Sequence, residues 1–316
     1  MRHSIEAVEE TDGSADRVAL FERYRARLFG IAYRMLGTVD DANDLVQECY
    51  LRWHQADPFA IEAPEGWLVA VITRLAIDRS RRVDVERRSY VGHWLPEPLA
   101  IGAPPPTDRR AELASDLSLA FLVLLERLAP EERAAFLLRE VLGIEYAELA
   151  RVLDRSEAAC RQMVHRARER VRTERPRYRV TPEAKRDLLE RFMRALEHED
   201  REALLAVVAP EATFISDGGG RVRAARRIIQ GAPRIVRMLL GVQRKWGDVR
   251  DEITWLNGEP ALVSYRGDQL FSTTSFDVDG DRLIGFYRVL NPEKLRRLAL
   301  AGARPTSAAA EDARPT

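Results

Sequence analysis

The stretch that decides the fold of the first half is residues 145–168, which read EYAELARVLDRSEAACRQMVHRAR. Two short helical patterns meet at Asp154-Arg155, and Ser156 is placed to cap the second helix. Apolar residues then recur at i, i+4, i+7 and i+11, which predicts one buried stripe. Its members are Cys160, Val164, Ala167 and Val171. The segment predicts a helix-turn-helix in which Asp154 takes the left-handed conformation that aspartate tolerates.

The outward side of the second helix is basic and polar. Arginine and glutamine side chains can read base edges in the major groove, and further arginines can hold phosphates. Residues 155–179 contain nine arginines against three glutamates, a local excess suited to a polyanion. The predicted DNA contacts of this motif are Ser156, Arg161, Gln162, His165, Arg166 and Arg168. The same pattern also fits a solvated, arginine-rich hairpin within a helical bundle.

The composition narrows the class of protein. A chain of 316 residues suggests two or three compact units. Lys and Arg (50) balance Asp and Glu (50), so net charge indicates no partner. Cys49 and Cys160 both fall in apolar helical stripes and are expected to be reduced, buried thiols. Residues 1–16 lack a signal-peptide core, and no apolar run approaches the ~18 residues that span a bilayer. We therefore expect a cytoplasmic protein without membrane contact.

Helical periodicity covers residues 18 to about 178, interrupted by a proline-rich break. After Pro176, two helical patterns are followed by β-rich runs. Asn257-Gly258 and Asp279-Gly280 separate several of these runs and predict hairpins in a meandering antiparallel sheet. The predicted fold is multidomain, with two all-α modules followed by an α+β domain. The expected divisions are 15–84 (helical module), 85–114 (linker), 115–176 (helix-turn-helix module), 180–300 (α+β domain) and 301–316 (disordered tail).

A second helix carries an unusual acidic face. It is expected to begin at Asp40 as its N-cap, with an apolar side that contains Cys49. Asp41, Asp44 and Glu48 lie together on another face, where like charges repel by a few tenths of a kcal/mol each. A basic partner would offset this repulsion. A merely solvated face is the alternative.

These segments resemble the extracytoplasmic-function (ECF) sigma factors of bacterial RNA polymerase. Residues 40–48, DDANDLVQE, are similar to the signature of sigma region 2.2. Residues 65–82, EGWLVAVITRLAIDRSRR, look like regions 2.3–2.4, and residues 128–168 resemble region 4, the reader of the −35 element. The resemblance implies that region 2.2 docks on a coiled coil in the polymerase clamp through Asp41, Asp44, Gln47 and Glu48. It implies that regions 2.3–2.4 melt and read the −10 element.

The arginines of residues 65–82 suit that role, because guanidinium groups hold phosphates. They are Arg74, Arg79, Arg81 and Arg82. Arg74 falls where many relatives carry asparagine, so the sequence does not predict the preferred −10 bases. Trp67 is expected in the core, as aromatic residues of helices usually are.

Three further motifs resemble the sigma-J-like group, whose members carry a SnoaL-like C-terminal domain. They are YVGHWLPEPL at 90–99, DGGGR at 217–221 and NPEKL at 291–295. The resemblance implies a SnoaL-like (nuclear-transport-factor-like) cone that, with the linker, controls sigma activity in place of a separate anti-sigma protein. The regulatory residues so implied are Trp94, Leu95, Pro96, Asp217, Gly218, Gly219, Gly220, Arg221, Asn291, Pro292 and Lys294. A stiff spacer, a structural turn and a plain helix start are the alternatives for the three motifs.

Enzymatic motifs are absent from the sequence. The five histidines have no metal-ligand spacing, and Asp217 and Asp268, the candidate acids in a cone, have no evident partner. We expect no catalytic residue, cofactor or metal, and leave open a small ligand in the cone. The predicted partners are RNA polymerase core and promoter DNA. The alternatives are a one-component regulator with a ligand-sensing cone and a SnoaL-like enzyme with a DNA-binding appendage. The acidic helix and the arginines of 74–82 favour the initiation factor, because a simple repressor needs neither.

Overall fold

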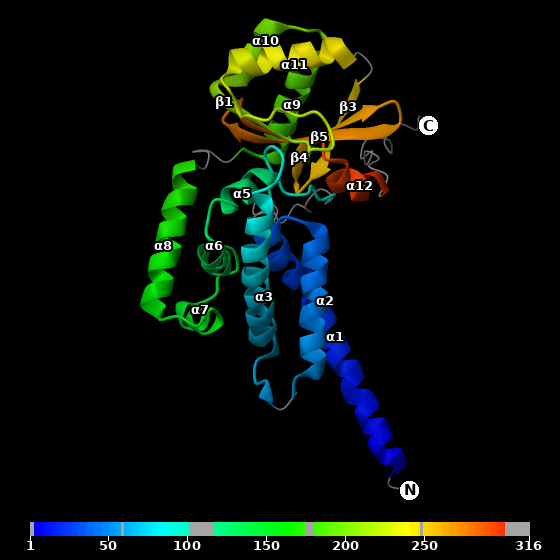
Figure 1. Cartoon of the computed structure of the whole chain (residues 1–316), viewed down its shortest axis with the longest axis vertical. Helices are drawn as coiled ribbons and strands as arrows, with labels where there is room; N and C mark the ends of the chain where they lie inside the picture. The colour runs from blue at the N-terminus through cyan, green and yellow to red at the C-terminus, as the bar shows by residue number, and fades with distance from the viewer. Residues whose placement is uncertain (1–2, 58–59, 101–116, 175–179, 247–248, 301–316) are drawn as a thin grey trace, which may run out of the picture. The chain divides into compact units, whose positions relative to one another are not determined.

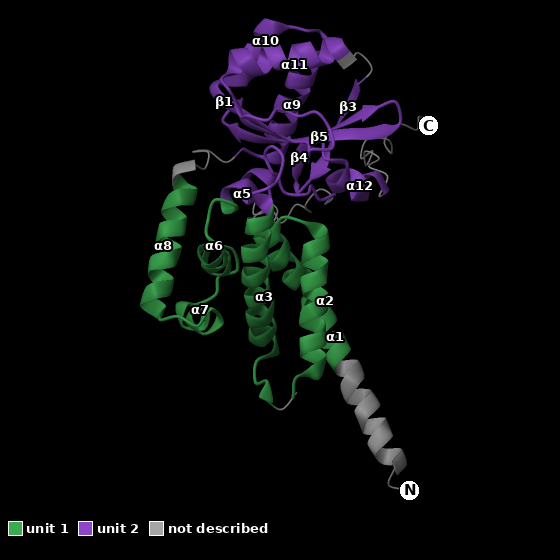
Figure 2. Ribbon diagram, in the orientation of Figure 1, with its two compact units in different colours: residues 1–86, 125–173 green, residues 87–124, 174–316 purple. Residues whose placement is uncertain are grey.

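The computed structural model describes residues 3–57, 60–100, 117–174, 180–246 and 249–300 (Figure 1). The chain divides into two compact units (Figure 2). Unit 1 contains residues 1–86 and 125–173, and unit 2 contains residues 87–124 and 174–316. The predicted tail at 301–316 and residues 101–114 of the predicted linker lie outside the described residues.

Unit 1 is all-α, as predicted. Its core is built from fully buried side chains such as Phe21, Tyr33 and Ile72. The helices are α1 (His3–Leu36), α2 (Val39–Gln55), α3 (Pro64–Arg87), α6 (Pro130–Phe136), the π-helix η2 (Leu137–Val141), α7 (Tyr146–Leu153) and α8 (Glu157–Glu174). The expected N-cap at Asp40 is wrong. The cap is Thr38, whose backbone is extended, and Asp40 lies in the first turn of α2.

The helix-turn-helix is formed by α7 and α8. Asp154 ends α7 in the left-handed conformation, with φ 52° and ψ 54°, as the turn requires. Ser156 begins α8 by accepting a hydrogen bond from the Ala159 amide at 3.2 Å. The predicted stripe of Cys160, Val164, Ala167 and Val171 is buried. Within α7, however, Val152 is buried beside Leu149, whereas Ala150 and Leu153 are only partly buried.

Unit 2 is an α+β domain. Its strands lie in the order β2-β1-β6-β5-β4-β3. They are β1 (Val208–Asp217), β2 (Ile229–Gln230), β3 (Val249–Leu256), β4 (Glu259–Arg266), β5 (Gln269–Asp279) and β6 (Arg282–Val289). The predicted meander holds for β3 to β6, which pair antiparallel. The expectation of a purely antiparallel sheet is wrong, because β1 pairs with β6 in parallel, a contact that local hairpin signals do not specify.

Three helices of unit 2 pack on one side of the sheet and complete the core: α9 (Pro182–Glu197), α10 (Arg201–Val207) and α11 (Ala232–Trp246). The last helix, α12 (Pro292–Leu300), lies on the other side of the sheet (Figure 1). Helix α5 (Leu119–Leu125) contributes all but its last residue to unit 2. Phe192 of α9 contacts Phe276 and Phe286, each with ring centroids 5.8 Å apart. Thr181 caps α9 by accepting from the Ala184 amide, and proline follows at its first turn, as predicted.

Residues 90–99, which form neither helix nor strand, lie against this domain, and we call this segment the strap. Asn257 fastens its end: the Asn257 amide donates to the Leu99 carbonyl at 2.8 Å, and the Leu99 amide donates to Asn257 Oδ1 at 3.0 Å. The contacts therefore group this part of the linker with the C-terminal domain.

Candidate polymerase, DNA and regulatory surfaces

The outward face of α8 is open to solvent. Arg161, Gln162, His165, Arg166 and Arg168 are all exposed. Ser156 is also exposed and caps the helix, so its hydroxyl is already used within the protein. An exposed helix with arginine and glutamine on its surface has the form of a recognition helix.

The arginines of α8 are partly neutralised by acids of unit 1. Arg166 and Arg170 both donate to Glu132, at 3.1 and 2.7 Å. Arg168 donates to Glu140 at 2.7 Å. Surface pairs of this kind stabilise by about 0–1 kcal/mol, so phosphates can replace the acids at low cost.

The acidic face of α2 is divided between two roles. Asp41 is half-buried and accepts from Arg79 at 2.9 and 2.6 Å, and from the Thr38 hydroxyl at 2.5 Å. Asp44 and Gln47 are exposed. Glu48 pairs with Arg52 one turn along the helix at 2.6 Å. Asp44 is therefore the most available acid of this face. Glu48 pairs only with an exposed arginine of its own helix, whereas Asp41 is more buried and paired with Arg79 of α3.

The four predicted DNA-binding arginines of α3 also differ in whether they have a partner within the protein. Arg74 donates from Nε to the Val152 carbonyl at 2.9 Å and from Nη2 to the Arg151 carbonyl at 2.8 Å. These carbonyls belong to the last turn of α7, which has no helical donors of its own. Arg82 is exposed and has no partner among the residues that the structure describes.

Arg81 pairs with Glu131 of α6 and, at 3.2 Å, with Asp78. Burial acts to raise the pKa of Glu131, but the hydrogen bonds from Arg81 and from the backbone, together with the positive charges of Arg81 and Arg155, outweigh it and leave that pKa below its usual value. Arg74 and Arg81 thus both contact the helix-turn-helix half of unit 1.

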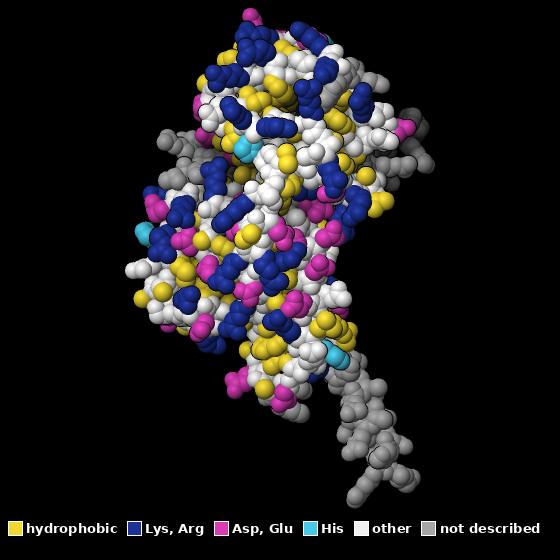
Figure 3. Space-filling view, viewed as in Figure 1, with side chains coloured by type: hydrophobic (Ala, Val, Ile, Leu, Met, Phe, Trp, Pro, Cys, Tyr) yellow, Lys and Arg dark blue, Asp and Glu magenta, His cyan; other side chains and the backbone are white. Residues whose placement is uncertain are grey.

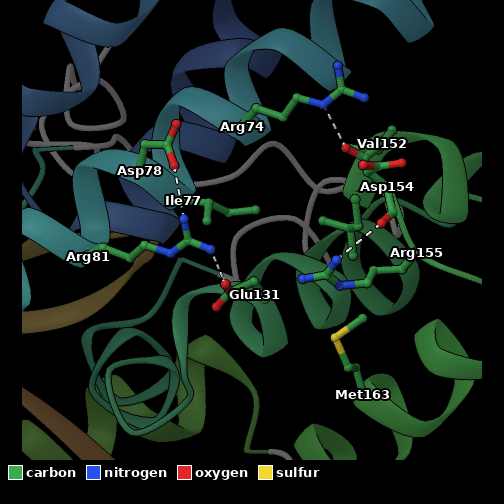
Figure 4. Close-up of a pocket in the computed structure, with 10 residues that line it drawn as sticks. Arg74, Ile77, Asp78, Arg81, Glu131, Val152, Asp154, Arg155 and Met163 are labelled. Carbon is green, nitrogen blue, oxygen red and sulfur yellow. Dashed lines mark hydrogen bonds and ion pairs between the residues drawn. The ribbon is translucent and has the colours of Figure 1, made fainter.

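A cavity of about 400 Å³ lies between these contacts (Figure 4). Arg74, Ile77, Asp78 and Arg81 of α3 form one wall, and the opposite wall comes from the helix-turn-helix and from Glu131. Figure 4 shows Arg74 directed to Val152 and Arg81 directed to Glu131 across it. Two of the predicted −10 readers, Arg74 and Arg81, therefore contact residues of the predicted −35 module.

Arg133 was missed by the sequence analysis. Its side chain is 1% exposed, donates to the carbonyls of Met35 and Leu128, and pairs with Glu126 at 3.0 Å. A buried guanidinium needs such partners, since desolvation of an unpaired charge is costly. The residue stands in a polar stretch, LAPEER, where nothing distinguishes it from its exposed neighbours.

The strap is held on the C-terminal domain by one buried carboxylate. Asp217 is fully buried and accepts from the Leu95 amide at 2.9 Å, from the Tyr90 hydroxyl at 2.6 Å and from Lys294 at 2.6 Å. Lys294 also donates to the Leu95 carbonyl. Asn291 donates from Nδ2 to the Tyr90 oxygen at 3.0 Å. We call these five residues the clasp. It brings together predicted residues from all three motifs.

Tyr90 is the member of the clasp absent from the predicted regulatory set. Burial, together with its hydrogen bond to Asp217, raises the pKa of its hydroxyl. Lys294 lies 4.1 Å from the ring centre of Trp94 and 5.2 Å from that of Tyr90. These aromatic faces add cation–π attraction to the ion pair.

The remaining predicted residues support the clasp to different degrees. Leu95 and Pro96 are buried, whereas Pro292 is exposed at the start of α12. Arg221 makes an exposed pair with Glu293 at 2.6 Å. Arg221 and Glu293 both belong to unit 2.

The three glycines at 218–220 form a tight turn rather than an anion cradle. A Cβ on Gly218 would lie 2.5 Å from the Val222 carbonyl oxygen. Gly219 has φ +59°, and a Cβ there would collide with the Asn291 side chain. The turn thus needs glycine in order to approach the clasp.

The cone contains a small internal cavity between its phenylalanines. This cavity has a volume of about 20 Å³, room for about one water, and its wall also includes Asp251 and Arg288. Burial raises the pKa of Asp251 and lowers that of Arg288. Of the two candidate acids, Asp217 belongs to the clasp and Asp268 is exposed. A second cavity, of about 290 Å³, adjoins this one, because both are lined by Leu196 and Asp251. A small ligand in the cone thus stays a prediction.

Both cysteines are buried, as predicted, and burial raises the pKa of Cys49 to about 12. Among the described residues, no His, Cys, Asp and Glu side chains group as a metal site. No helix in the described part is long and apolar enough to cross a membrane.

Comparison with known proteins identifies the family of the chain. The model of Sigma-70 region 2 matches residues 20–85, and that of Sigma-70, region 4 matches residues 118–171. The ECF RNA polymerase sigma factor SigJ of Mycobacterium tuberculosis is 34% identical over 291 residues, 88% of this chain and 92% of SigJ. The chain belongs to the ECF sigma factor family. Its region 2 lies in α1 to α3, and its region 4 includes the helix-turn-helix.

The similarity extends through the C-terminal domain. The crystal structure of the M. tuberculosis ECF sigma factor SigJ matches with a TM-score of 0.71 at 32% identity, covering 88% of this chain and 98% of that chain. The probable ECF sigma factor SigI of M. tuberculosis is 28% identical over 282 residues, 88% of this chain and 94% of its own length. The predicted α+β domain at the C-terminus is confirmed. As a sigma factor, the chain is an initiation factor that binds polymerase core and promoter DNA. The family's role in transcription initiation is a non-enzymatic one.

Proposed function

We propose that this ECF sigma factor directs core polymerase to its promoters through the surfaces described above, and that the clasp regulates this activity. Asp44, Gln47 and Glu48 present the exposed part of the acidic face to a basic polymerase surface. Arg79 and Asp41 orient that face by pairing with each other. Arg161, Gln162, His165 and Arg168 enter the −35 major groove, and Arg74, Arg81 and Arg82 hold phosphates near the −10 element.

The clasp is the observation that carries the regulatory part. A linker that joins two DNA-binding modules must be free to follow the path that polymerase and promoter impose. Here residues 90–99 are fastened to the cone by a buried ion pair and backbone hydrogen bonds. Fastening shortens the free tether between the modules and lowers the number of spacings they can reach. The cone and strap thus take the place of a separate anti-sigma protein. The proposed site of action is the cytoplasm, where polymerase transcribes.

The acidic face tests the sigma part of the proposal. We expect Asp44→Arg with Glu48→Arg to abolish run-off transcription with purified core polymerase, because reversed charges repel the basic partner. Core affinity, measured by fluorescence titration, should fall by a factor of about ten or more, equivalent to about 1.4 kcal/mol.

Arg52→Ala is the matched control, since it removes the surface pair of Glu48 but keeps the acids. Normal circular dichroism together with unchanged core affinity in the double variant would refute the assignment of this face.

A further inference from the structure

The segment that leads from the DGGGR motif into α11 and through that helix has no acidic residue. Residues 218–246 contain eight basic side chains and neither Asp nor Glu. Two of the eight are paired: Arg221 with Glu293 and Arg244 with Glu199. The other six are exposed and have no partner among the residues that the structure describes. We call these six the basic face: Arg223, Arg226, Arg227, Arg234, Arg237 and Lys245.

The basic face differs from the arginines of unit 1. There, Arg79, Arg81 and Arg166 each have an acidic partner. On unit 2, Figure 3 shows Lys and Arg side chains gathered over α11 and the segment before it, with few acidic side chains among them. Unneutralised like charges repel one another, so this arrangement lowers the stability of the free protein unless a polyanion offsets it.

In helix α11 the positive charges lie on the side of the helix that faces solvent. Ile235, Val236 and Leu239 are buried in the core, while Arg234 and Arg237 point to solvent one turn apart. The first turn of α11 carries no acid that would neutralise its positive end. Because the apolar side of the helix is used in the core, none of it remains to enter a membrane, which removes a lipid surface as the partner.

The composition of the face suits phosphate. Five of its six members are arginines, whose planar guanidinium binds phosphate oxygens bidentately. Double-stranded DNA presents one charge per ~1.7 Å of its axis, and sigma factors bind promoter DNA. We propose that the basic face binds the phosphate backbone of double-stranded promoter DNA, as a contact additional to those of regions 2 and 4. This inference rests on the proposed function, because the basic face would meet promoter DNA when the chain binds a promoter as part of the holoenzyme.

The test is promoter binding by holoenzyme, assembled from core polymerase and the full chain, between 50 and 200 mM salt. Arg234→Glu with Arg237→Glu should weaken binding by about tenfold or more, and flatten the dependence of log K on log salt by about two, because each lost phosphate contact removes ~0.9 from the slope. The loss should be equal on a promoter and on a duplex with scrambled flanks, since phosphate contacts carry no sequence information.

The matched control is Arg266→Glu with Arg282→Glu, which makes the same change in charge at two exposed hairpin positions close to Asp268 and Asp281. This control should bind DNA like the wild type. A second variant, Arg223→Ala with Arg226→Ala and Arg227→Ala, leaves α11 intact and should flatten the slope by about three.

Three outcomes would overturn the inference. Unchanged affinity and slope in both basic-face variants would mean that the face only keeps the domain in solution. Equal loss in the control would mean that total charge acts rather than this face. Loss of core binding with intact DNA binding would assign the face to an acidic protein surface. If wild-type holoenzyme does not assemble, the proposed function fails, and the same salt titration of the free chain on duplex DNA still decides the basic face.

Discussion

Among single residues, Arg161 has the position best suited to read a base. It is exposed on α8, and among the described residues its guanidinium contacts the Glu157 carboxylate and the ring of Tyr146. We expect Arg161→Ala to weaken −35 recognition by about 1–3 kcal/mol and to reduce discrimination between bases at one position. Binding of holoenzyme to a set of single-base promoter variants measures both.

Arg172→Ala is the control for this prediction, because Arg172 is exposed near the end of the same helix. A uniform loss on every promoter variant in Arg161→Ala, with a shallower salt dependence, would show a phosphate contact instead of a base contact.

Asp277 makes the stability of the C-terminal domain depend on pH. Burial raises its pKa to about 6, from about 3.8 in the unfolded chain. A raised pKa means that the folded state binds the proton more tightly, so stability is greatest below about pH 3.8 and falls as pH rises through about 6. The difference amounts to at most about 3 kcal/mol. We expect Asp277→Asn to raise the melting temperature at pH 8 and to change it little at pH 4, as thermal unfolding would show.

Asp268→Asn is the comparison, since Asp268 is exposed in a hairpin turn. Equal melting temperatures of Asp277→Asn and wild type at pH 8 would mean that Asp277 is not destabilised by burial.

The residues also show what a sequence can reveal about a site. The three motifs predicted Asp217, Asn291 and Lys294 as one regulatory group, and the structure joins them. Tyr90 was not predicted to contact Asp217, because the two are 127 positions apart and neither hydrophobic period nor turn chemistry specifies such a pair. Arg133 was missed for the same reason, since its burial depends on the Met35 carbonyl of the distant helix α1.

Among the elements, the contact of α3 with α7 engages the −10 and −35 modules with each other. Arg74 donates two hydrogen bonds to carbonyls of the last turn of α7. We expect Arg74→Ala to lower the free energy of unfolding of the full chain by about 1 kcal/mol, the usual net value for such bonds at a partly exposed site. Urea denaturation followed by circular dichroism measures this change.

Arg82→Ala, on the same helix, should change the free energy of unfolding by less than about 0.5 kcal/mol. Equal effects of the two variants would indicate that the hydrogen bonds to α7 do not stabilise unit 1. Arg74 could then bind DNA without a loss of stability from its broken hydrogen bonds to α7.

Local elements were predictable where sequence period and capping chemistry decide them. The helix-turn-helix followed from the stripe at Cys160 to Val171, from the Ser156 cap and from the tolerance of Asp154 for the left-handed turn. The parallel pairing of β1 with β6 was not predictable in this way. It joins strands separated by α11 and four further strands, and packing of the whole domain selects it.

For the whole molecule, the central claim is that the clasp couples the cone to promoter-dependent initiation. Removal of Lys294 would leave the carboxylate of Asp217 buried without its cation, at a cost of about 3–5 kcal/mol, and would release the strap. Tyr90→Phe is the milder change, since it removes the hydroxyl that donates to Asp217 and receives the Asn291 amide. Arg221→Ala is the control, because its pair with Glu293 is exposed and outside the clasp.

The most direct measurement is run-off transcription by core polymerase on the protein's own promoter with wild type, Lys294→Met, Tyr90→Phe and Arg221→Ala, with hydrogen exchange of the strap amides read in parallel. The account predicts faster exchange at Leu95 in Lys294→Met and Tyr90→Phe, and a transcript yield that differs from wild type in the same direction for both. The factor should be about five for Tyr90→Phe, for a loss of about 1 kcal/mol, and larger for Lys294→Met. Arg221→Ala should match the wild type. Faster exchange at Leu95 in both clasp variants, with wild-type transcript yield, would contradict the claim.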